Sequence, residues 1–209
     1  MSPTIGRPIP FANGVLGKCY HVCAFFHSAD EEYRVMMPFY RDGLQRGERC
    51  FHIVDSQLRA DHVCRLAAAG IDVEAVERSG QLELRDWQQT YLRDGRFDHS
   101  RMLASMQQIL AEGPRDGYPL TRVMGHAEWS SGDWPGVKDL LKYEARLNDI
   151  ISTDTGPVIC VYNLSKLAAG LVIDVMRTHP MVVIGGVLQE NPFYMPPEEL
   201  LRVFRDRDV

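Results

Sequence analysis

The stretch that most constrains the fold of this chain is residues 20–33, where an apolar run of strand length is followed at once by a helical pattern. Ser28 can cap that helix, and three acidic residues follow in its first turn, where carboxylates favour the positive end of the helix dipole. In open α/β sheets, a ligand crevice lies outside the carboxyl end of such a strand. A phosphate site there needs a Gly-rich loop and a lysine, and residues 27–32 contain neither. We therefore expect a nucleotide-like architecture without phosphate chemistry.

Strand and helix patterns alternate through the rest of the chain. Short apolar runs predict further strands at residues 50–54, 71–76, 82–84, 122–127, 158–162 and 182–187. Amphipathic patterns predict helices at residues 30–45, 58–69, 97–112, 136–151, 165–177 and 198–204. This alternation is typical of β-α-β crossovers, in which helices cover both faces of a mostly parallel sheet. The expected fold class is therefore α/β, a single three-layer domain at residues 19–209 after an irregular lead-in at residues 1–18.

Length and composition fit one globular domain. The 209 residues carry a formal net charge of -5, which argues against a general nucleic-acid surface because phosphate binding needs a basic patch. No apolar run approaches the roughly 20 residues of a membrane span, and residues 1–10 lack the apolar core of a signal peptide. The five cysteines have no CxxC spacing, so we interpret them as reduced core thiols. We expect a cytoplasmic protein that binds neither membrane nor nucleic acid directly.

Polar side chains follow the ends of several predicted strands. Because the carboxyl ends of parallel strands meet at one edge of a sheet, we expect these residues to line one ligand pocket. The alternative for Ser28, Asp55 and Asn163 is a purely structural role as helix caps. His126, Glu128 and Trp129 do not fit a cap so easily, and a carboxylate beside a histidine can bind a hydroxylic or cationic ligand. The candidate ligand-binding residues are His27, Ser28, Asp55, His126, Glu128, Trp129, Tyr162 and Asn163.

A metal site is a second arrangement that the sequence leaves open. His21 and Cys23 share one face of a strand, as do Cys50 and His52, and tetrahedral zinc accepts both residue types. If the two strands were neighbours, the four side chains would lie within coordinating range. The competing interpretation is that the cysteines are small core residues and that the histidines are buried and hydrogen-bonded.

Three further charged or polar features have simpler interpretations. The charges of residues 138–146, Glu144 among them, are expected on a solvated helical face. His179 precedes a proline and is expected in a turn. Arg122 lies within a predicted strand, and a buried arginine needs an acidic partner, for which we expect Glu128 or Asp55. No catalytic residue is assigned, because the sequence has no GxSxG motif and no cysteine in electropositive surroundings.

Several short segments along residues 20–197 resemble the MEDS domain, a sensory domain of methanogen and methylotroph regulators: HVCAFFHSADE, GERCFHIVDS, TRVMGHAEW, LLKYEARLN, VICVYNLSKL, RTHPMVVIGG and NPFYMPP. The resemblance implies a RecA/KaiC-like core whose phosphate-binding loop has decayed. It also implies a ligand-sensing module that acts on a regulatory partner, such as a kinase or a transcription factor. It leaves room for a homo-oligomer.

The sequence and this resemblance together favour a non-enzymatic sensory domain that binds a small organic ligand at the carboxyl ends of the strands. One alternative is a degenerate nucleotide-binding protein or an enzyme that uses the same rim. The others are a metal-binding sensor that uses histidine and cysteine, and a partner-binding module. ATP is not an expected cofactor because the lysine and the Gly-rich loop are missing, whereas zinc stays open.

Overall fold

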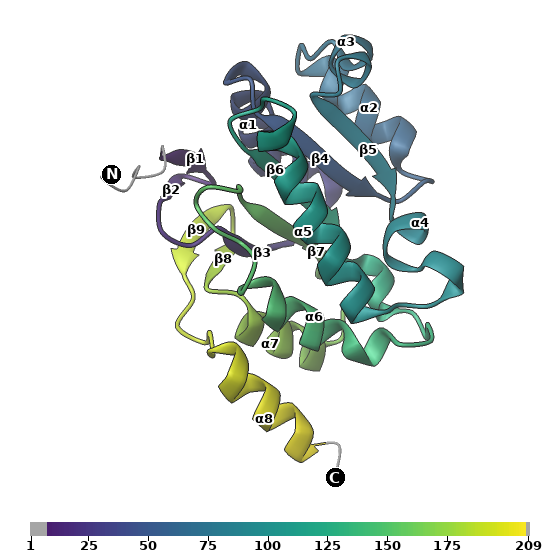
Figure 1. Ribbon diagram of the computed structural model, residues 1–209, viewed down its shortest axis with the longest axis vertical. Helices are drawn as coiled ribbons and strands as arrows, with labels where there is room; N and C mark the ends of the chain where they lie inside the picture. Colours follow the sequence, from purple (N-terminus) through teal and green to yellow (C-terminus); the bar gives the residue numbers. More distant parts are fainter. Residues whose placement is uncertain (1–7, 208–209) are drawn as a thin grey trace.

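The computed structural model describes residues 8–207 and is built around a seven-stranded sheet with the strand order β5-β4-β6-β7-β3-β8-β9 (Figure 1). Neighbouring strands are parallel throughout, except that β9 runs antiparallel to β8. The sequence therefore predicted the mostly parallel sheet correctly. The strands are β3 (His21–Phe26), β4 (Arg49–Val54), β5 (Leu82–Asp86), β6 (Thr121–His126), β7 (Val158–Asn163), β8 (Met181–Ile184) and β9 (Val187–Glu190).

Helices cover both faces of this sheet, as predicted. The side chains of each strand alternate between two hydrophobic cores, so that Cys23 and Phe25 of β3 belong to one core and Ala24 to the other. Helices α1 (Ala29–Gln45), α2 (Arg59–Ala68) and α3 (Val73–Arg78) pack over what we call the α1 face. Helices α4 (Trp87–Tyr91), α5 (His99–Arg115), α6 (Leu140–Leu147) and α7 (Ala169–Thr178) pack over the α5 face.

The closing helix α8 (Pro197–Arg207) extends beyond the sheet beside α6 and α7 (Figure 1). Residues 8–207 also contain three short 3-10 helices: η1 (Arg93–Gly95), η2 (Glu128–Ser131) and η3 (Val137–Asp139). Within residues 8–207, no helix combines the length and the apolar character needed to cross a membrane.

The lead-in is more regular than predicted. Strands β1 (Ile9–Phe11) and β2 (Gly14–Leu16) form an antiparallel hairpin, while residues 1–7 lie outside the described part of the chain. Ala12 and Asn13 form its turn with φ angles of 46° and 57°. Ile9, Phe11 and Leu16 are buried against the α1 side of the protein. The prediction missed this hairpin because three-residue strands with one buried side each give almost no periodic signal.

The predicted strand at residues 71–76 is also wrong. This segment begins α3, and the Asp72 carboxylate caps that helix by accepting a hydrogen bond from the Ala75 N–H at 3.0 Å. The cap outweighs the weak strand preference of Ile71, Val73 and Val76. The cap predicted for α1 is confirmed, because Ser28 accepts a hydrogen bond from the Glu31 N–H at 3.2 Å. Asp98 caps α5 in the same way and accepts from the Arg101 N–H at 2.9 Å.

Arg122 is fully buried, and its predicted partners are wrong. Its guanidinium lies 2.5 Å from Glu48 and 2.6 Å from Asp42, and it donates to the Phe39 carbonyl at 2.7 Å. Arg122 is the second residue of β6, so its side chain starts at the amino end of the strand. Glu128 follows the opposite end. The network therefore ties α1 to the sheet far from the strand-end rim.

Candidate functional site

A hollow of about 240 Å³ lies at the carboxyl ends of β4 and β6. Four of the eight residues predicted to bind a ligand line it: Asp55 after β4, His126 at the end of β6, and Glu128 and Trp129 in the following turn. The other lining residues are Trp87, Ser131, Gly132, Trp134 and Lys166. We call this set the rim hollow. Parallel strands brought its four predicted residues together, as the strand-end argument expected.

The apolar wall of the rim hollow contains all three tryptophans of the protein. Trp87 stacks on Trp129 with ring centroids 6.5 Å apart and meets Trp134 edge-on at 6.0 Å. Tyr91 stacks behind Trp129 at 4.9 Å and so fixes the indole. Such rings offer a flat, rigid surface to an apolar or partly polar molecule at low entropic cost.

His126 is the central polar group of the rim hollow. Its ring is buried, and its Nε2 lies 2.9 Å from the Oε1 atom of Glu32 on α1. Burial lowers the pKa of His126, but the carboxylates of Glu32, Glu128 and Asp55 oppose that effect and leave the pKa above its ordinary value. These carboxylates therefore stabilise the protonated ring.

Two buried polar atoms in the rim hollow have no hydrogen-bond partner within residues 8–207. They are the Nδ1 atom of His126 and the Nε1 atom of Trp129, and both residues are 5% exposed. Leaving a buried donor or acceptor unpaired costs on the order of 1–3 kcal/mol, so native proteins usually supply a water or a ligand group. His126 and Trp129 both line the rim hollow, so they are the residues at which we look for hydrogen bonds to a bound molecule.

The outer edge of the rim hollow is charged. Lys166, after β7, forms an ion pair with Glu128, and the Lys166 side chain is half exposed. Asp55 accepts a hydrogen bond from the Gln57 N–H at 2.9 Å, which leaves its second oxygen for other contacts. The edge therefore presents one cation among several carboxylates.

Four predicted residues are not in this hollow, and three of them lie near the starts of the turns and helices that follow the strands. Ser28 caps α1, and the backbone N–H of His27 donates to Glu31 at 2.8 Å, so both belong to a capping arrangement. Asn163 accepts from the Ser165 N–H at 2.9 Å and from its hydroxyl at 2.6 Å. The geometry of Ser28 and Asn163 therefore fits the structural role given above as the alternative to ligand binding, in which their side chains cap the segment that follows.

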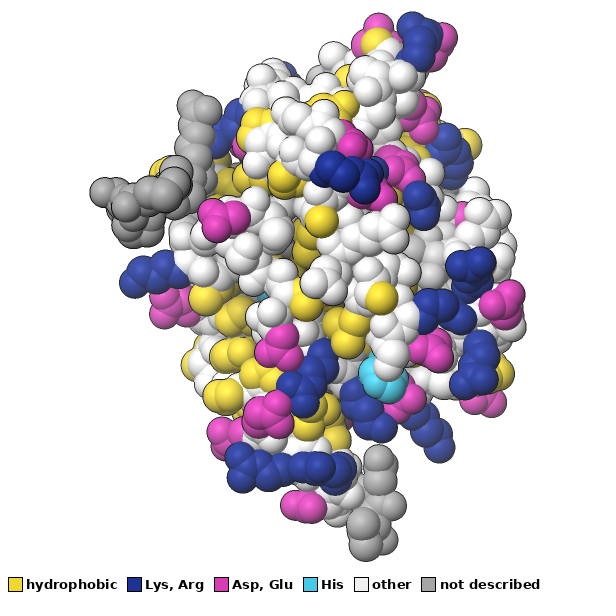
Figure 2. All heavy atoms as spheres, in the orientation of Figure 1, with side chains coloured by type: hydrophobic (Ala, Val, Ile, Leu, Met, Phe, Trp, Pro, Cys, Tyr) yellow, Lys and Arg dark blue, Asp and Glu magenta, His cyan; other side chains and the backbone are white. Residues whose placement is uncertain are grey.

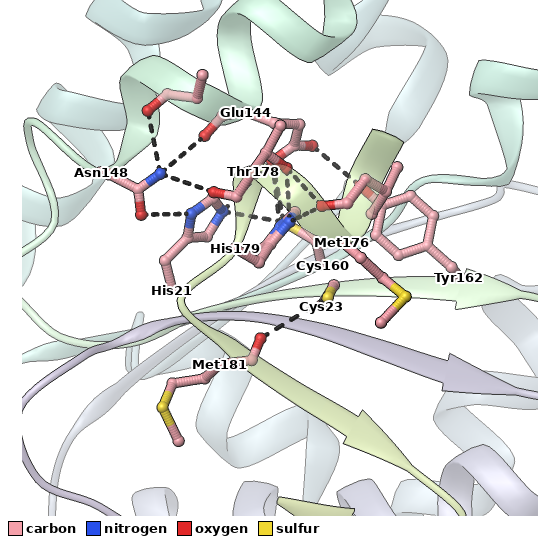
Figure 3. Close-up of polar contacts among 12 residues, drawn as sticks. His21, Cys23, Glu144, Asn148, Cys160, Tyr162, Met176, Thr178, His179 and Met181 are labelled. Carbon is pink, nitrogen blue, oxygen red and sulfur yellow. Dashed lines mark hydrogen bonds and ion pairs between the residues drawn. The ribbon is translucent and has the colours of Figure 1, made fainter. Parts of the chain in front are cut away.

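Tyr162 points away from the rim, into a buried cluster on the α5 face (Figure 3). Its hydroxyl donates to Glu144 at 3.2 Å, and Glu144 also faces His21, Cys160 and His179. Burial raises the pKa of Glu144 and lowers the pKa values of His21 to about 4 and of His179 to about 3. Glu144 is therefore buried, contrary to the predicted solvated face.

The metal set predicted from the sequence is wrong for two reasons. Strands β3 and β4 are separated by β6 and β7, so His21 and Cys23 are not beside Cys50 and His52. Moreover, Cys23 belongs to the core of the α5 face and Cys50 to that of the α1 face. His21 instead joins Glu144, Cys160 and His179 in the buried cluster.

The sequence analysis missed five residues of the rim hollow: Trp87, Ser131, Gly132, Trp134 and Lys166. Trp87 comes directly after β5, so the same strand-end rule would have found it had the predicted strand at residues 82–84 been extended by two residues. Lys166 lies in the turn after β7, three residues past the strand end. Trp134 was visible only as part of a loop, and its indole packs tightly over Gly132, where a side chain would collide.

Residues 20–180 match the family described as MEDS: MEthanogen/methylotroph, DcmR Sensory domain. This chain belongs to the MEDS family. It is also 22% identical over 162 residues to the transcriptional repressor DcmR of Methylorubrum extorquens, an alignment that covers 76% of this chain and 57% of the repressor. The chain thus spans little more than half the length of that curated relative.

Two solved structures share the fold at low sequence identity. The KaiC-like protein PH0186 of Pyrococcus horikoshii is 14% identical with a TM-score of 0.57, covering 80% of this chain and 71% of that one. The flagellar accessory protein FlaH of Methanocaldococcus jannaschii is 12% identical with a TM-score of 0.51, covering 86% and 76%. The MEDS domain therefore has a RecA/KaiC-like fold, as the resemblance implied.

Proposed function

We propose that this MEDS domain is a non-enzymatic cytoplasmic sensor that binds a small organic molecule in the rim hollow and relays binding to a regulatory partner. The family supports a sensory and regulatory role. The observation that carries the ligand site is the pair of unpartnered buried atoms, His126 Nδ1 and Trp129 Nε1, beside a tryptophan-lined hollow. The proposal is that a ligand supplies their missing partners.

The size and chemistry of the rim hollow restrict the ligand. A volume of about 240 Å³ is below the roughly 300–1,000 Å³ of pockets for drug-sized molecules, so a molecule of a few heavy atoms fits best. Three indoles favour an apolar body, and the Trp129 N–H requires an acceptor on the ligand. Short alcohols and amides satisfy both conditions, whereas halogenated methanes supply only the apolar body.

The relay to a partner would run through the turn at residues 128–134, which supplies five of the residues around the hollow. A ligand that contacts Trp129 and Trp134 fixes this turn and changes the surface next to it. The partner would be a kinase or a transcription factor, because the curated relative is a transcriptional repressor. On the face drawn in Figure 2, Lys and Arg side chains are interspersed with Asp and Glu, which favours a protein partner over direct nucleic-acid contact.

Residual nucleotide binding is the alternative that the fold raises. At the β3–α1 junction, the Ser28 side chain occupies the Glu31 N–H, and the Glu31 carboxylate occupies the His27 N–H. Asp30, Glu31 and Glu32 add negative charge to that helix start. Backbone donors and positive charge are the two requirements of a phosphate site, so this junction opposes a triphosphate. A calorimetric titration with magnesium ATP is expected to show no binding heat.

The emission of the three tryptophans tests the ligand site directly, because all of them line it. We would titrate the whole chain with 1-butanol, acetamide and dichloromethane as probes and follow the emission maximum. At least one probe is expected to saturate the signal, and His126→Ala or Glu128→Ala to weaken its affinity about tenfold, the loss of one hydrogen bond. His27→Ala is the matched control, since His27 is exposed on the same rim outside the hollow. Unchanged affinities in both hollow variants would exclude this site.

A further inference from the structure

We propose that His21, Glu144, Cys160 and His179 form a closed binding site for one divalent transition-metal ion of the zinc class. The four side chains come from β3, α6, β7 and the α7–β8 connection, and all are buried. Each offers one ligand atom, and these atoms lie within 4.8 Å of one another. Figure 3 shows the two imidazoles side by side with Glu144 facing them from α6. The site is independent of the rim hollow.

The distances between the ligand atoms fit a tetrahedral zinc ion. Glu144 Oε2 lies 3.3 Å from His21 Nε2, 3.5 Å from His179 Nε2 and 3.5 Å from Cys160 Sγ. Cys160 Sγ lies 3.7 Å from His21 Nε2. Usual zinc–nitrogen, zinc–oxygen and zinc–sulfur bonds at tetrahedral angles place such atoms about 3.3–3.7 Å apart. Four edges of the tetrahedron therefore have the required length.

The outer contacts of both histidines direct their Nε2 lone pairs into the site. His179 Nδ1 lies 2.9 Å from the Val175 carbonyl, and His21 Nδ1 lies 3.1 Å from Asn148 Oδ1. Both partners accept, so each Nδ1 carries the proton and each Nε2 is free to bind a cation. Asn148 is itself fixed, because its Nδ2 donates to the Thr178 carbonyl at 2.8 Å. Metal-binding histidines commonly have such outer acceptors.

The chemistry inside the cluster favours a cation over hydrogen bonds alone. Two imidazole lone pairs and a carboxylate face one another, and His179 Nε2 has no hydrogen-bond partner within residues 8–207. A divalent ion bound by one thiolate, one carboxylate and two neutral imidazoles gives a net charge of zero. Such a neutral group can be buried without the cost of an isolated charge.

Binding is a ligand exchange with no change of oxidation state. Four metal–ligand bonds form as the water molecules that hydrate the ion leave it, the Cys160 thiol releases its proton to solvent, and any proton on Glu144 leaves in the same way. A second hollow, of about 200 Å³, has His21 and Asn148 in its lining, so one ligand of the cluster and its outer contact border a surface hollow. The four side chains fill all four coordination positions of a tetrahedral ion. The bound ion would therefore hold α6 and the α7–β8 connection against β3 and β7.

Metal content and cobalt spectroscopy on the whole chain test the site. The chelator-treated protein would be equilibrated with zinc and measured by elemental analysis, and a second sample would be titrated with cobalt(II). We expect one zinc per chain and a thiolate-to-cobalt charge-transfer band with the intense visible bands of tetrahedral cobalt. Cys160→Ser should abolish that band and weaken zinc binding more than about 100-fold, and Asn148→Ala, an outer-contact change, about 10–100-fold.

Cys50→Ser and His52→Gln are the matched controls, since both residues are equally buried but lie on the α1 face. They should bind zinc like the wild-type protein. The proposal is overturned if the folded wild-type protein takes up no zinc, or if its cobalt complex lacks the thiolate band. The cobalt spectrum of the wild-type protein tests the proposal even where a variant fails to fold. Equal loss of zinc in Cys50→Ser and Cys160→Ser would also overturn it.

Discussion

The two faces of the sheet both bury histidines, but they pair them differently. On the α1 face, the Tyr33 hydroxyl lies 2.5 Å from His62 Nδ1, and His62 Nε2 lies 3.0 Å from His52 Nδ1. Each contact can match one donor with one acceptor. On the α5 face, the Nε2 atoms of His21 and His179 face the carboxylate of Glu144 at 3.3 and 3.5 Å. There, two imidazole nitrogens and a carboxylate, all hydrogen-bond acceptors, face one another.

This difference shows that burial of a histidine says little about its role. A chain of matched hydrogen bonds satisfies itself and stabilises the core. Converging acceptors need a proton or a cation between them, and the rim hollow presents a third case in which unpaired atoms lie beside open space. The hydrogen-bond partner of each ring nitrogen is what separates core, cation site and ligand site.

The largest expected effect comes from removing the buried carboxylate of each face. In the presence of a chelator, Glu144→Ala is expected to lower the free energy of unfolding by about 2–5 kcal/mol, because two buried donors, the Tyr162 hydroxyl and the Cys160 thiol, lose their acceptor. Glu32→Ala removes one contact, to His126, and should cost about 1–3 kcal/mol. Urea denaturation measures both. A larger loss for Glu32→Ala would reverse the proposed ranking of the two faces.

Matched tyrosine substitutions give a smaller and more selective effect. Tyr162→Phe and Tyr33→Phe each remove one buried hydroxyl contact, so each should cost about 1–3 kcal/mol of unfolding free energy. Only Tyr162→Phe should also weaken zinc binding, about 10–100-fold, because its hydroxyl orients Glu144. Zinc competition against a chromophoric chelator measures this. Equal zinc affinities in the two variants would place Tyr162 outside the metal site.

The pH dependence of stability should differ in sign between two histidines of the α1 side. Burial lowers the pKa of His62 to about 3, so its unfolded form takes up the proton first and stability falls as the pH drops from about 6.5 towards 3. The pKa of His126 is raised by Glu32 despite burial, so its contribution is complete below about 6.5 and is lost as the pH rises through the higher value. Thermal unfolding of the two variants should be measured across this pH range. His62→Gln should lose the fall in stability at low pH, and His126→Gln should lose the fall at high pH.

The smallest expected effect on stability is at the edge of the rim hollow. The Lys166 side chain is half exposed, so Lys166→Ala should change the unfolding free energy by less than about 1 kcal/mol. It frees the Glu128 carboxylate and should therefore change the affinity of tryptophan-detected probes. A stability loss comparable to that of Glu144→Ala would mean that the rim is structural.

The sequence predicted the layered sheet and half of the rim because both follow from local patterns. Apolar runs ending in polar residues placed Asp55 and His126 at one edge without any knowledge of strand order. Tyr162 was misplaced because the side chains of a strand alternate, and its ring faces the α5 core while the neighbouring Asn163 lies at the turn. A strand end fixes position along the sheet, but only register fixes the face.

The metal cluster could not be found from sequence spacing. Its ligands are 139 residues apart between His21 and Cys160, and Glu144 lies on a helix whose charges suggested a solvated face. Sequence reasoning paired His21 with Cys50 and His52 by assuming adjacent strands, whereas two strands intervene. Strand order is set by crossover packing of the whole chain, which local periodicity does not encode.

Native mass spectrometry of three proteins tests most directly whether the cation site and the rim hollow are separate. The wild-type chain, Cys160→Ser and His126→Ala would each be equilibrated with equimolar zinc and measured intact. One zinc is expected on the wild type and on His126→Ala, and none on Cys160→Ser. Zinc retained by Cys160→Ser, or a wild-type mass equal to that of the bare polypeptide, would contradict the account.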